Sequence, residues 1–382
     1  MLAADAAVLW DLYRAGWEVA ALVELLREQF GLASADAQVH IDALCQQWRD
    51  NGLLTVDGKS GGYFASAEPL PGIPEPDEIP VSPDAWRLMV ADRLIALRVE
   101  HLGHRAQLEP LLAPCRLSTL ALDETASPTA PTAAPIAAPI AAIDRVALEG
   151  DLDAWSLTAN GKKLHTGGGV DAALVLTLNT LIELGCRTRE RLFAAHAAGL
   201  QASDGRGLLL VARGGSGKTT LATALNATGF SLLSDDVVPV TLEGDLLGLG
   251  LPLTLKSGAW PVLDRYRSDL AVAPIRQRLG RQVRFLPVQG CPAQGPVLSS
   301  LCLFPRYAPD QPISQTRLSP EQVLQGLIEA DIGFRGIDQG WVDGLAQWIE
   351  RLPAYQITYP DLETALAQVH TLLQAHAEEG GS

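Results

Sequence analysis

The sequence has few cysteines, no long apolar run and no basic N-terminal segment, and each shortage excludes a class of protein. Its five cysteines are scattered, odd in number and never spaced as CxxC, which argues against a disulfide framework and a zinc knuckle. No run approaches the roughly 18 apolar residues that a membrane span needs. The N-terminus has no signal-type apolar core, so we expect a cytoplasmic protein with no membrane partner.

Basic charge is also scarce. The chain has 29 Lys and Arg residues against 44 Asp and Glu residues, a formal net charge of −15. Because a hold on a polyphosphate backbone needs clustered Lys and Arg, we expect no nucleic-acid partner. Hydrophobic residues make up 47% of the 382 residues, enough for well-filled cores, and this length predicts two domains.

Residues 1–66 predict a small helical domain. Apolar residues recur at helical spacing in three runs, each followed by a glycine, and Asp57-Gly58 then suits the turn of a short hairpin. Three helices and a two-stranded wing are a winged-helix plan, and such a domain often binds DNA. The third helix has three aspartates and one arginine, so its face would repel phosphates.

Two low-complexity segments punctuate the rest. Residues 67–83 contain six prolines and predict a semi-rigid linker, whereas the Ala/Pro/Thr run at 125–142 predicts a surface loop. Residues 94–99 and 146–164 are strand-like, with Asn160-Gly161 as a hairpin turn. From residue 174 the pattern becomes helix, strand, loop, helix, strand, which indicates that residues 84–382 form an α/β nucleotide-binding domain.

The most specific motif follows an unbroken apolar strand at 208–211. It reads Ala-Arg-Gly-Gly-Ser-Gly-Lys-Thr, a P-loop with Ala at the usual first Gly. Glycines suit this loop because its backbone curls closely round phosphate oxygens. Lys218 is expected to bridge the β- and γ-phosphates of ATP, and the Thr219 hydroxyl to ligate Mg²⁺. The predicted nucleotide-binding residues are Ala212, Arg213, Gly214, Gly215, Ser216, Gly217, Lys218, Thr219 and Thr220.

A pair of acids, Asp235 and Asp236, follows the next predicted strand. The carboxyl edge of such a sheet is where α/β proteins bind ligands. We expect one carboxylate to hold Mg²⁺ with Thr219 and another to accept the proton of an attacking hydroxyl, with the assignment between the two left open. Adjacent side chains on a strand point to opposite faces, so a local bend is required. A turn with solvated acids is the alternative.

Several motifs in combination resemble the HPr serine kinase family. They are Ala-Ala-His196-Ala-Ala, Gly-Gly-Ser-Gly-Lys-Thr-Thr, Leu-Leu-Ser-Asp-Asp, and Pro-Leu-Thr-Leu-Lys256-Ser-Gly. They are more closely similar to the HPr-kinase-related proteins of peptide-modification systems, including lasso-peptide precursor kinases. The resemblance covers about residues 84–375. It implies a phosphoenolpyruvate-carboxykinase-like P-loop fold, ATP and Mg²⁺, phosphorylation of a hydroxyl, and a place for His196 near the transferred phosphate.

Basic residues complete the expected site. Lys256 and Arg284 are candidates to stabilise charge on the moving phosphoryl group, with Arg213 and Arg187 as weaker candidates. For each of these residues the alternative is a solvated surface position. For His196 the alternative is a buried histidine whose hydrogen bonds are satisfied within the core. Thr220 stands where bifunctional enzymes of the family have an acid, and we identify no counterpart of their glycine-rich, arginine-containing segment after the acidic pair. We therefore expect neither HPr as substrate nor the reverse dephosphorylation.

Residues 1–66 resemble the pyrroloquinoline-quinone synthesis protein D family through W-x-L-Y, E-L-L-x-x-F-G and D-N-G-L-L. Those winged-helix chaperones bind leader peptides as an added strand; a purely structural domain and a DNA-binding one are the alternatives. The two resemblances imply an ATP-dependent kinase that phosphorylates a hydroxyl, with serine as the expected acceptor, on a peptide or small molecule in ribosomal peptide modification. A chaperone that uses nucleotide as a switch is the alternative. HPr kinases are hexamers, so the resemblance also implies a homo-oligomer.

Overall fold

The computed structural model describes residues 73–76, 81–117, 143–187, 191–212, 215–278, 280–290, 295–330 and 339–379, with a few isolated residues before them. The chain divides into two compact units, Met1–Ala67 and Glu68–Ser382. In the first unit the described residues are helical: Val19, Ala20, Val23, Gln38, Ile41, Asp42 and Cys45. The predicted wing and the loop at 125–142 lie outside the described residues.

The second unit begins with a five-stranded sheet of order β1-β2-β3-β4-β5. Its strands are β1 (Trp86–Val90), β2 (Arg93–Val99), β3 (Asp144–Gly150), β4 (Trp155–Ala159) and β5 (Lys162–Gly167). All neighbours are antiparallel except β2 and β3. β1 and β4 alternate buried and half-buried residues, and α5 (Val170–Gly185) contacts the strands. Asn160 and Gly161 have positive φ and make the predicted turn between β4 and β5.

A six-stranded sheet of order β15-β16-β14-β8-β7-β9 forms the centre of the unit. Its strands are β7 (Ala197–Gln201), β8 (Gly207–Val211), β9 (Ser231–Ser234), β14 (Ser299–Tyr307), β15 (Ser314–Arg317) and β16 (Ala354–Tyr359). β14 runs parallel to β8 and β16, while β7 is antiparallel to both β8 and β9. The carboxyl ends of β8, β9, β14 and β16 therefore meet at one edge.

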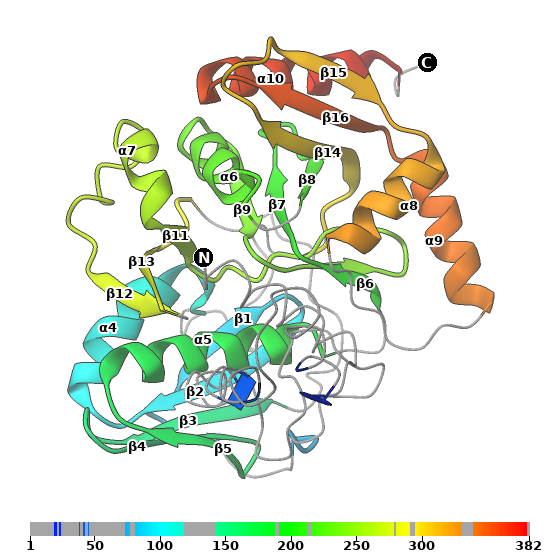
Figure 1. Cartoon of the computed structure of the whole chain (residues 1–382). Coiled ribbons are helices and arrows are strands. Elements are labelled where there is room, and N and C mark those ends of the chain that lie inside the picture. The colour runs from blue at the N-terminus through cyan, green and yellow to red at the C-terminus, as the bar shows by residue number, and fades with distance from the viewer. Residues whose placement is uncertain are drawn as a thin grey trace, which may run out of the picture. The chain divides into compact units, whose positions relative to one another are not determined.

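Helices cover both faces of this central sheet (Figure 1). α6 (Lys218–Ala227) and α10 (Leu362–Glu379) pack with Leu208 and Leu210 of β8 on one face. α8 (Pro320–Glu329) and α9 (Gln339–Arg351) pack with Leu209 and Val211 on the other. Burial on both faces explains why β8 reads as an unbroken apolar run, as central strands do. The protein is a mixed α/β structure with open sheets.

Smaller elements frame the sheet edge. β6 (Arg191–Ala195) pairs with β10 (Val238–Thr241), and β11 (Leu253–Lys256), β13 (Arg281–Leu286) and β12 (Ile275–Arg278) form a three-stranded sheet in that order. The remaining described elements are α4 (Leu102–Leu112), the 3₁₀ turns η1 (Ala113–Cys115) and η3 (Ser257–Ala259), and α7 (Trp260–Leu263). Among the helices that the structure describes, none is long and apolar enough to cross a membrane.

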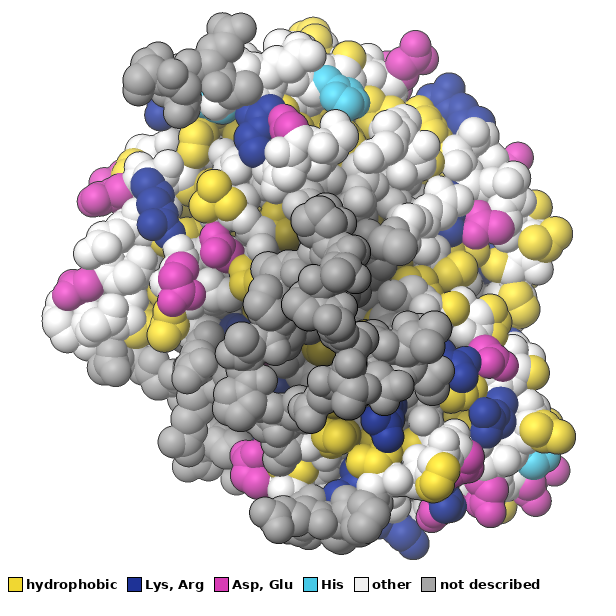
Figure 2. Space-filling view, turned by 180° about the vertical axis from the view of Figure 1, so that it is seen from behind, with side chains coloured by type: hydrophobic (Ala, Val, Ile, Leu, Met, Phe, Trp, Pro, Cys, Tyr) yellow, Lys and Arg dark blue, Asp and Glu magenta, His cyan; other side chains and the backbone are white. Residues whose placement is uncertain are grey.

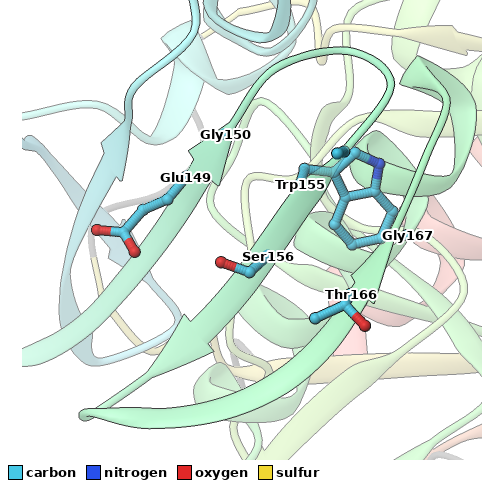
Figure 3. Close-up of a pocket in the computed structure, with 7 residues that line it drawn as sticks. Glu149, Gly150, Trp155, Ser156, Thr166 and Gly167 are labelled. Atoms are coloured by element: carbon cyan, nitrogen blue, oxygen red, sulfur yellow. The ribbon is translucent and has the colours of Figure 1, made fainter.

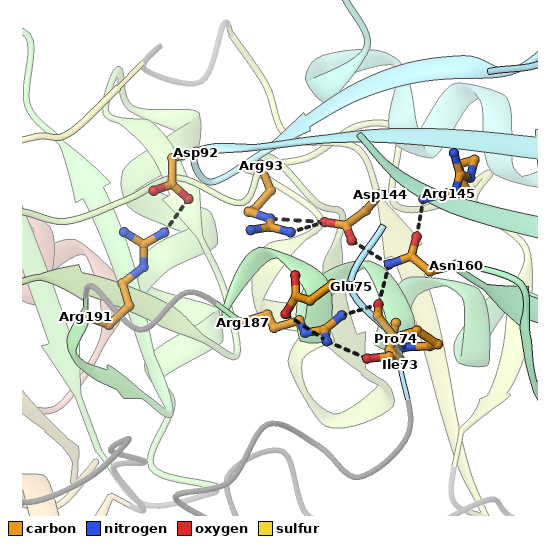
Figure 4. Close-up of polar contacts among 10 residues, drawn as sticks. All are labelled: Ile73, Pro74, Glu75, Asp92, Arg93, Asp144, Arg145, Asn160, Arg187 and Arg191. Atoms are coloured by element: carbon orange, nitrogen blue, oxygen red, sulfur yellow. Dashed lines mark hydrogen bonds and ion pairs between the residues drawn. The ribbon is translucent and has the colours of Figure 1, made fainter. Parts of the chain in front are cut away.

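Part of the proline-rich linker is fixed to the second unit (Figure 4). Arg187, at the end of α5, donates hydrogen bonds to the carbonyls of Ile73 and Pro74 and lies 3.2 Å from a carboxylate oxygen of Glu75. The Nδ2 of Asn160 donates to the same Pro74 carbonyl at 2.8 Å, and Ile73 is buried. Residues 73–76 are therefore anchored through the carbonyls of Ile73 and Pro74, whereas the sequence predicted a semi-rigid linker.

Candidate functional site

A glycine-containing loop joins the end of β8 to the start of α6. We call residues 212–217 the glycine loop; Arg213 and Gly214 lie outside the described residues. Gly215 and Gly217 have φ values of 89° and 91°, a left-handed conformation that side chains disfavour. A Cβ at Gly215 would meet no atom within 4 Å. The loop thus has open space beside Gly215, three residues before the first residue of α6.

Lys218 is the first residue of α6 and is buried. Its Nζ donates to the His196 carbonyl at 2.7 Å and lies 3.5 Å from the Ala212 carbonyl, so the side chain folds back along the loop. Burial lowers the pKa of Lys218 to about 8, although Asp235 and Asp236 act to raise it. The ammonium is thus held beside the loop and two carboxylates.

Asp235 follows β9 and faces the start of α6. The Thr219 hydroxyl donates to its Oδ1 at 3.2 Å, and its Oδ2 has no hydrogen-bond partner in the described part of the chain. Burial, and then the charge of Asp236, raise the pKa of Asp235 to about 7. A buried carboxylate oxygen without a partner is costly. The buried hydroxyl oxygen of Ser216 likewise has no hydrogen-bond partner among the described residues.

The bend that the acidic pair requires is present at Asp236, whose φ is 71°. Its Oδ2 accepts a hydrogen bond from the Arg278 Nη1 at 3.0 Å. Burial acts to raise the pKa of Asp236, but Arg278, His196 and Lys218 together lower it below its ordinary value. The two adjacent acids therefore have opposite environments: that of Asp235 favours the neutral form, and that of Asp236 favours the ionised form.

Arg278 was missed by the sequence argument. It ends β12 and reaches Asp236 across 42 positions of sequence. A usable signal was present, because residues 276–284 contain four arginines around Gly280, which has positive φ in the β12–β13 turn. The β12–β13 hairpin therefore brings an arginine to the acidic pair from a segment that follows the pair in the sequence.

The other predicted residues are distributed unevenly around this cluster. His196 lies between β6 and β7 and gives its carbonyl to Lys218, and exposed Lys256 ends β11, where its charge acts on Lys218. Arg284 instead donates to the Leu270 carbonyl and stacks 4.5 Å above the Trp260 ring. Arg187 holds the linker, as described above. Thr220 is half-buried in the first turn of α6.

The residues present suit a small divalent cation that keeps other oxygen ligands. Thr219 and Asp235 supply hard oxygen donors, and the unpartnered Asp235 Oδ2 is a ready ligand. Within the described ranges, no group of three or more His, Cys, Asp or Glu side chains is placed to hold a metal. Mg²⁺ commonly binds through one or two protein groups with substrate phosphates and water. The donor set fits Mg²⁺ in that mode.

A separate open pocket lies on the five-stranded sheet (Figure 3). It is lined by Glu149, Gly150, Ala154, Trp155, Ser156, Thr166 and Gly167. Glu149 is ion-paired with Arg98 at 2.7 Å, and the Trp155 indole donates to the Gly169 carbonyl. The lining shares no residue with the glycine loop or the acidic pair, and it contains no pair of groups suited to acid–base chemistry.

The surface charge in the view of Figure 2 is mixed. On the part that the structure describes, Lys and Arg side chains lie interspersed with Asp and Glu side chains. An interspersed pattern creates no broad field of one sign over that part of the surface.

No family model matches the chain, and no curated protein matches it. Among solved structures, the chain is similar to the Hpr(Ser) kinase/phosphatase from Coxiella burnetii at 15% identity. The match covers 50% of this chain and 99% of that one, with a TM-score of 0.25. At so low a score, functional inference has to come from the residues of this chain.

Proposed function

We propose that the protein is an ATP-dependent, Mg²⁺-dependent kinase that transfers a γ-phosphoryl group to a hydroxyl. The observation that supports this most is the cluster at one edge of the central sheet. It consists of the glycine loop, the buried Lys218, Thr219 hydrogen-bonded to Asp235, and the adjacent Asp236. These are the parts that phosphoryl transfer needs, since it depends on positioning and charge stabilisation.

Each residue of the cluster has a distinct task in this proposal. Loop amides and Lys218 hold the phosphates, and Thr219 with Asp235 would hold Mg²⁺, which supplies neutralisation of phosphate charge. Asp236, ionised by its Arg278 contact and the more exposed of the two acids, accepts the proton of the acceptor hydroxyl. The proposal thus gives the metal-binding role to Asp235 and the proton-accepting role to Asp236.

The acceptor in this proposal is a hydroxyl, most simply that of a serine, on a peptide. Its support is the sequence resemblance to kinases of peptide-modification systems and, for residues 1–66, to leader-peptide-binding proteins. Holding the peptide on the first unit would raise its effective concentration near the loop. A cytoplasmic setting with self-association accompanies the proposal on the same support.

The first experiment measures phosphate transfer. The full chain is incubated with γ-labelled ATP, Mg²⁺ and the short peptide encoded beside its gene, and phosphopeptide is detected by mass. Lys218→Met should lower the rate at least 100-fold, whereas Lys163→Met, which removes an exposed lysine from β5, should leave it unchanged. ATP turnover without any phosphopeptide would support the nucleotide-switch chaperone instead.

The second experiment separates the two acids. Asp235→Asn should raise the Mg²⁺ concentration needed for half-maximal rate, because a metal ligand is weakened. Asp236→Asn should lower kcat at saturating Mg²⁺ with little change in that concentration, because a proton acceptor is lost. The reverse pattern would exchange the two roles.

A further inference from the structure

A pair of tyrosines lies beside the glycine loop, on the side away from the acids. β14 neighbours β8 in the central sheet and ends at Tyr307, and β16 ends at Tyr359, which is paired in register with Tyr307. Because these strands run parallel to β8, both tyrosines lie at the edge where β8 enters the loop. This edge is where α/β sheets bind ligands.

Both tyrosines lie close to Gly217 of the loop. A Cβ at Gly217 would lie 3.1 Å from the Tyr359 Oη and 3.6 Å from the Tyr307 Cβ. Tyr359 is 1% exposed, whereas Tyr307 is 56% exposed. Their ring centroids are 6.0 Å apart at an interplanar angle of 49°. Tyr307 thus presents an aromatic surface to solvent directly beside the loop.

The strand order decides which end of a bound nucleotide reaches Tyr307. Asp235 follows β9, and in the sheet β7 and β9 lie on one side of β8 while β14 lies on the other. Thr219, hydrogen-bonded to Asp235, would hold the metal and the terminal phosphates on the β9 side. The opposite end of the nucleotide, which carries the base, then leaves the loop toward β14.

We propose that the ring of Tyr307 is the platform on which the base of the bound nucleotide stacks. This inference rests on the proposed function and adds a base-binding residue to the same site. The platform would accept purine bases with little discrimination, because stacking uses the π-face that every base has rather than its hydrogen-bonding edge. Similar affinity for MgATP and MgGTP is therefore expected.

The test compares ligands with and without a base. The full chain and its variants are titrated calorimetrically with MgATP and with magnesium tripolyphosphate, which has the phosphates alone. Tyr307→Ala and Tyr307→Leu should weaken MgATP binding roughly 5- to 100-fold, the range for loss of one base stack, and leave tripolyphosphate binding unchanged. Tyr307→Phe should keep wild-type affinity for both. Leu298→Ala, an exposed side chain just before the other end of β14, is the control.

Two results would overturn the platform while leaving the kinase proposal standing. One is unchanged MgATP affinity in both Tyr307→Ala and Tyr307→Leu. The other is an equal loss for MgATP and tripolyphosphate in variants whose thermal unfolding matches the wild type, since that pattern indicates damage to the loop. If the wild-type protein binds neither ligand, the proposed function itself fails.

Discussion

Alanine substitutions at Gly215 and Gly217 should separate the binding role of the glycine loop from its packing. Both residues have the left-handed φ that an alanine adopts only with strain. Only Gly217 is crowded, because its Cβ would lie 3.1 Å from the Tyr359 hydroxyl, whereas a Cβ at Gly215 would meet nothing within 4 Å. The two variants are therefore matched in backbone strain and differ in packing.

The magnitudes follow from these contacts. Left-handed strain costs about 1–2 kcal/mol, offset by about 0.4–1 kcal/mol from the lower entropy of the unfolded alanine chain, so Gly215→Ala should cost about 1 kcal/mol. Gly217→Ala adds a tight contact with the hydroxyl of the buried Tyr359, and overpacking costs about 1–3 kcal/mol. We expect Gly217→Ala to lower the free energy of unfolding by about 2–4 kcal/mol.

Urea unfolding of the four combinations with Tyr359→Phe measures the overlap directly. Removing the Tyr359 hydroxyl should bring the cost of Gly217→Ala close to that of Gly215→Ala, which gives a coupling of about 1 kcal/mol or more. In parallel, Gly215→Ala should weaken MgATP binding more than 10-fold despite its small effect on stability, because a methyl group would occupy the open space offered to phosphate.

Equal costs for the two alanines, or no relief in the Tyr359→Phe background, would refute the packing argument. Wild-type MgATP affinity in Gly215→Ala would refute the assignment of that open space to phosphate. The two parts fail independently, since one is read from unfolding and the other from binding.

Three further predictions concern charge and the linker. The pKa of Asp235 is raised from 3.8 to about 7, so between these pH values the folded state binds a proton that the unfolded state has lost, and wild-type stability falls as pH rises. Asp235→Asn lacks this titration. In metal-free buffer, the melting temperature of Asp235→Asn minus that of the wild type should therefore increase from pH 5 to pH 8. Arg278→Gln removes the hydrogen bond to Asp236 and should lower the free energy of unfolding at pH 7 by about 1–3 kcal/mol. The control Arg317→Gln, at an exposed position of β15, should leave that free energy unchanged. Arg187→Met removes donors from the carbonyls of Ile73 and Pro74 and should speed cleavage by the broad-specificity protease proteinase K within residues 73–76, which Arg317→Met should leave protected.

Local patterns were sufficient for the strand, loop and helix around Lys218. The unbroken run of β8 indicates a strand covered on both faces, and the glycines before Lys218 supply the positive φ values that the loop adopts. The need for a bend at the acidic pair was also predictable from the sequence, because adjacent side chains on a regular strand point to opposite faces. The positive φ of Asp236 provides that bend.

Long-range partners were not readable in the same way. Arg278, Arg284 and Arg187 have the same chemistry in the sequence, yet the structure pairs them with an aspartate, an aromatic ring and a linker backbone respectively. Only the tertiary fold decides which arginine meets an anion, because each pairing joins elements distant in sequence. Similarly, composition indicated a proline-rich spacer at 67–83, but its anchoring depends on donors supplied by Asn160 and Arg187.

The whole chain is acidic, whereas cationic side chains gather at the candidate site. The protein has a formal net charge of −15, but Lys218 and Arg278 lie beside Asp235 and Asp236, and the charge of Lys256 acts on Lys218. Burial and the neighbouring Asp236 raise the pKa of Asp235, which disfavours its ionised form and reduces the negative charge of the site. An acidic surface disfavours long polyanions, whereas a local cationic excess with glycine-loop amides favours a small anion such as a triphosphate. This difference supports a nucleotide rather than a nucleic acid as the ligand of the site.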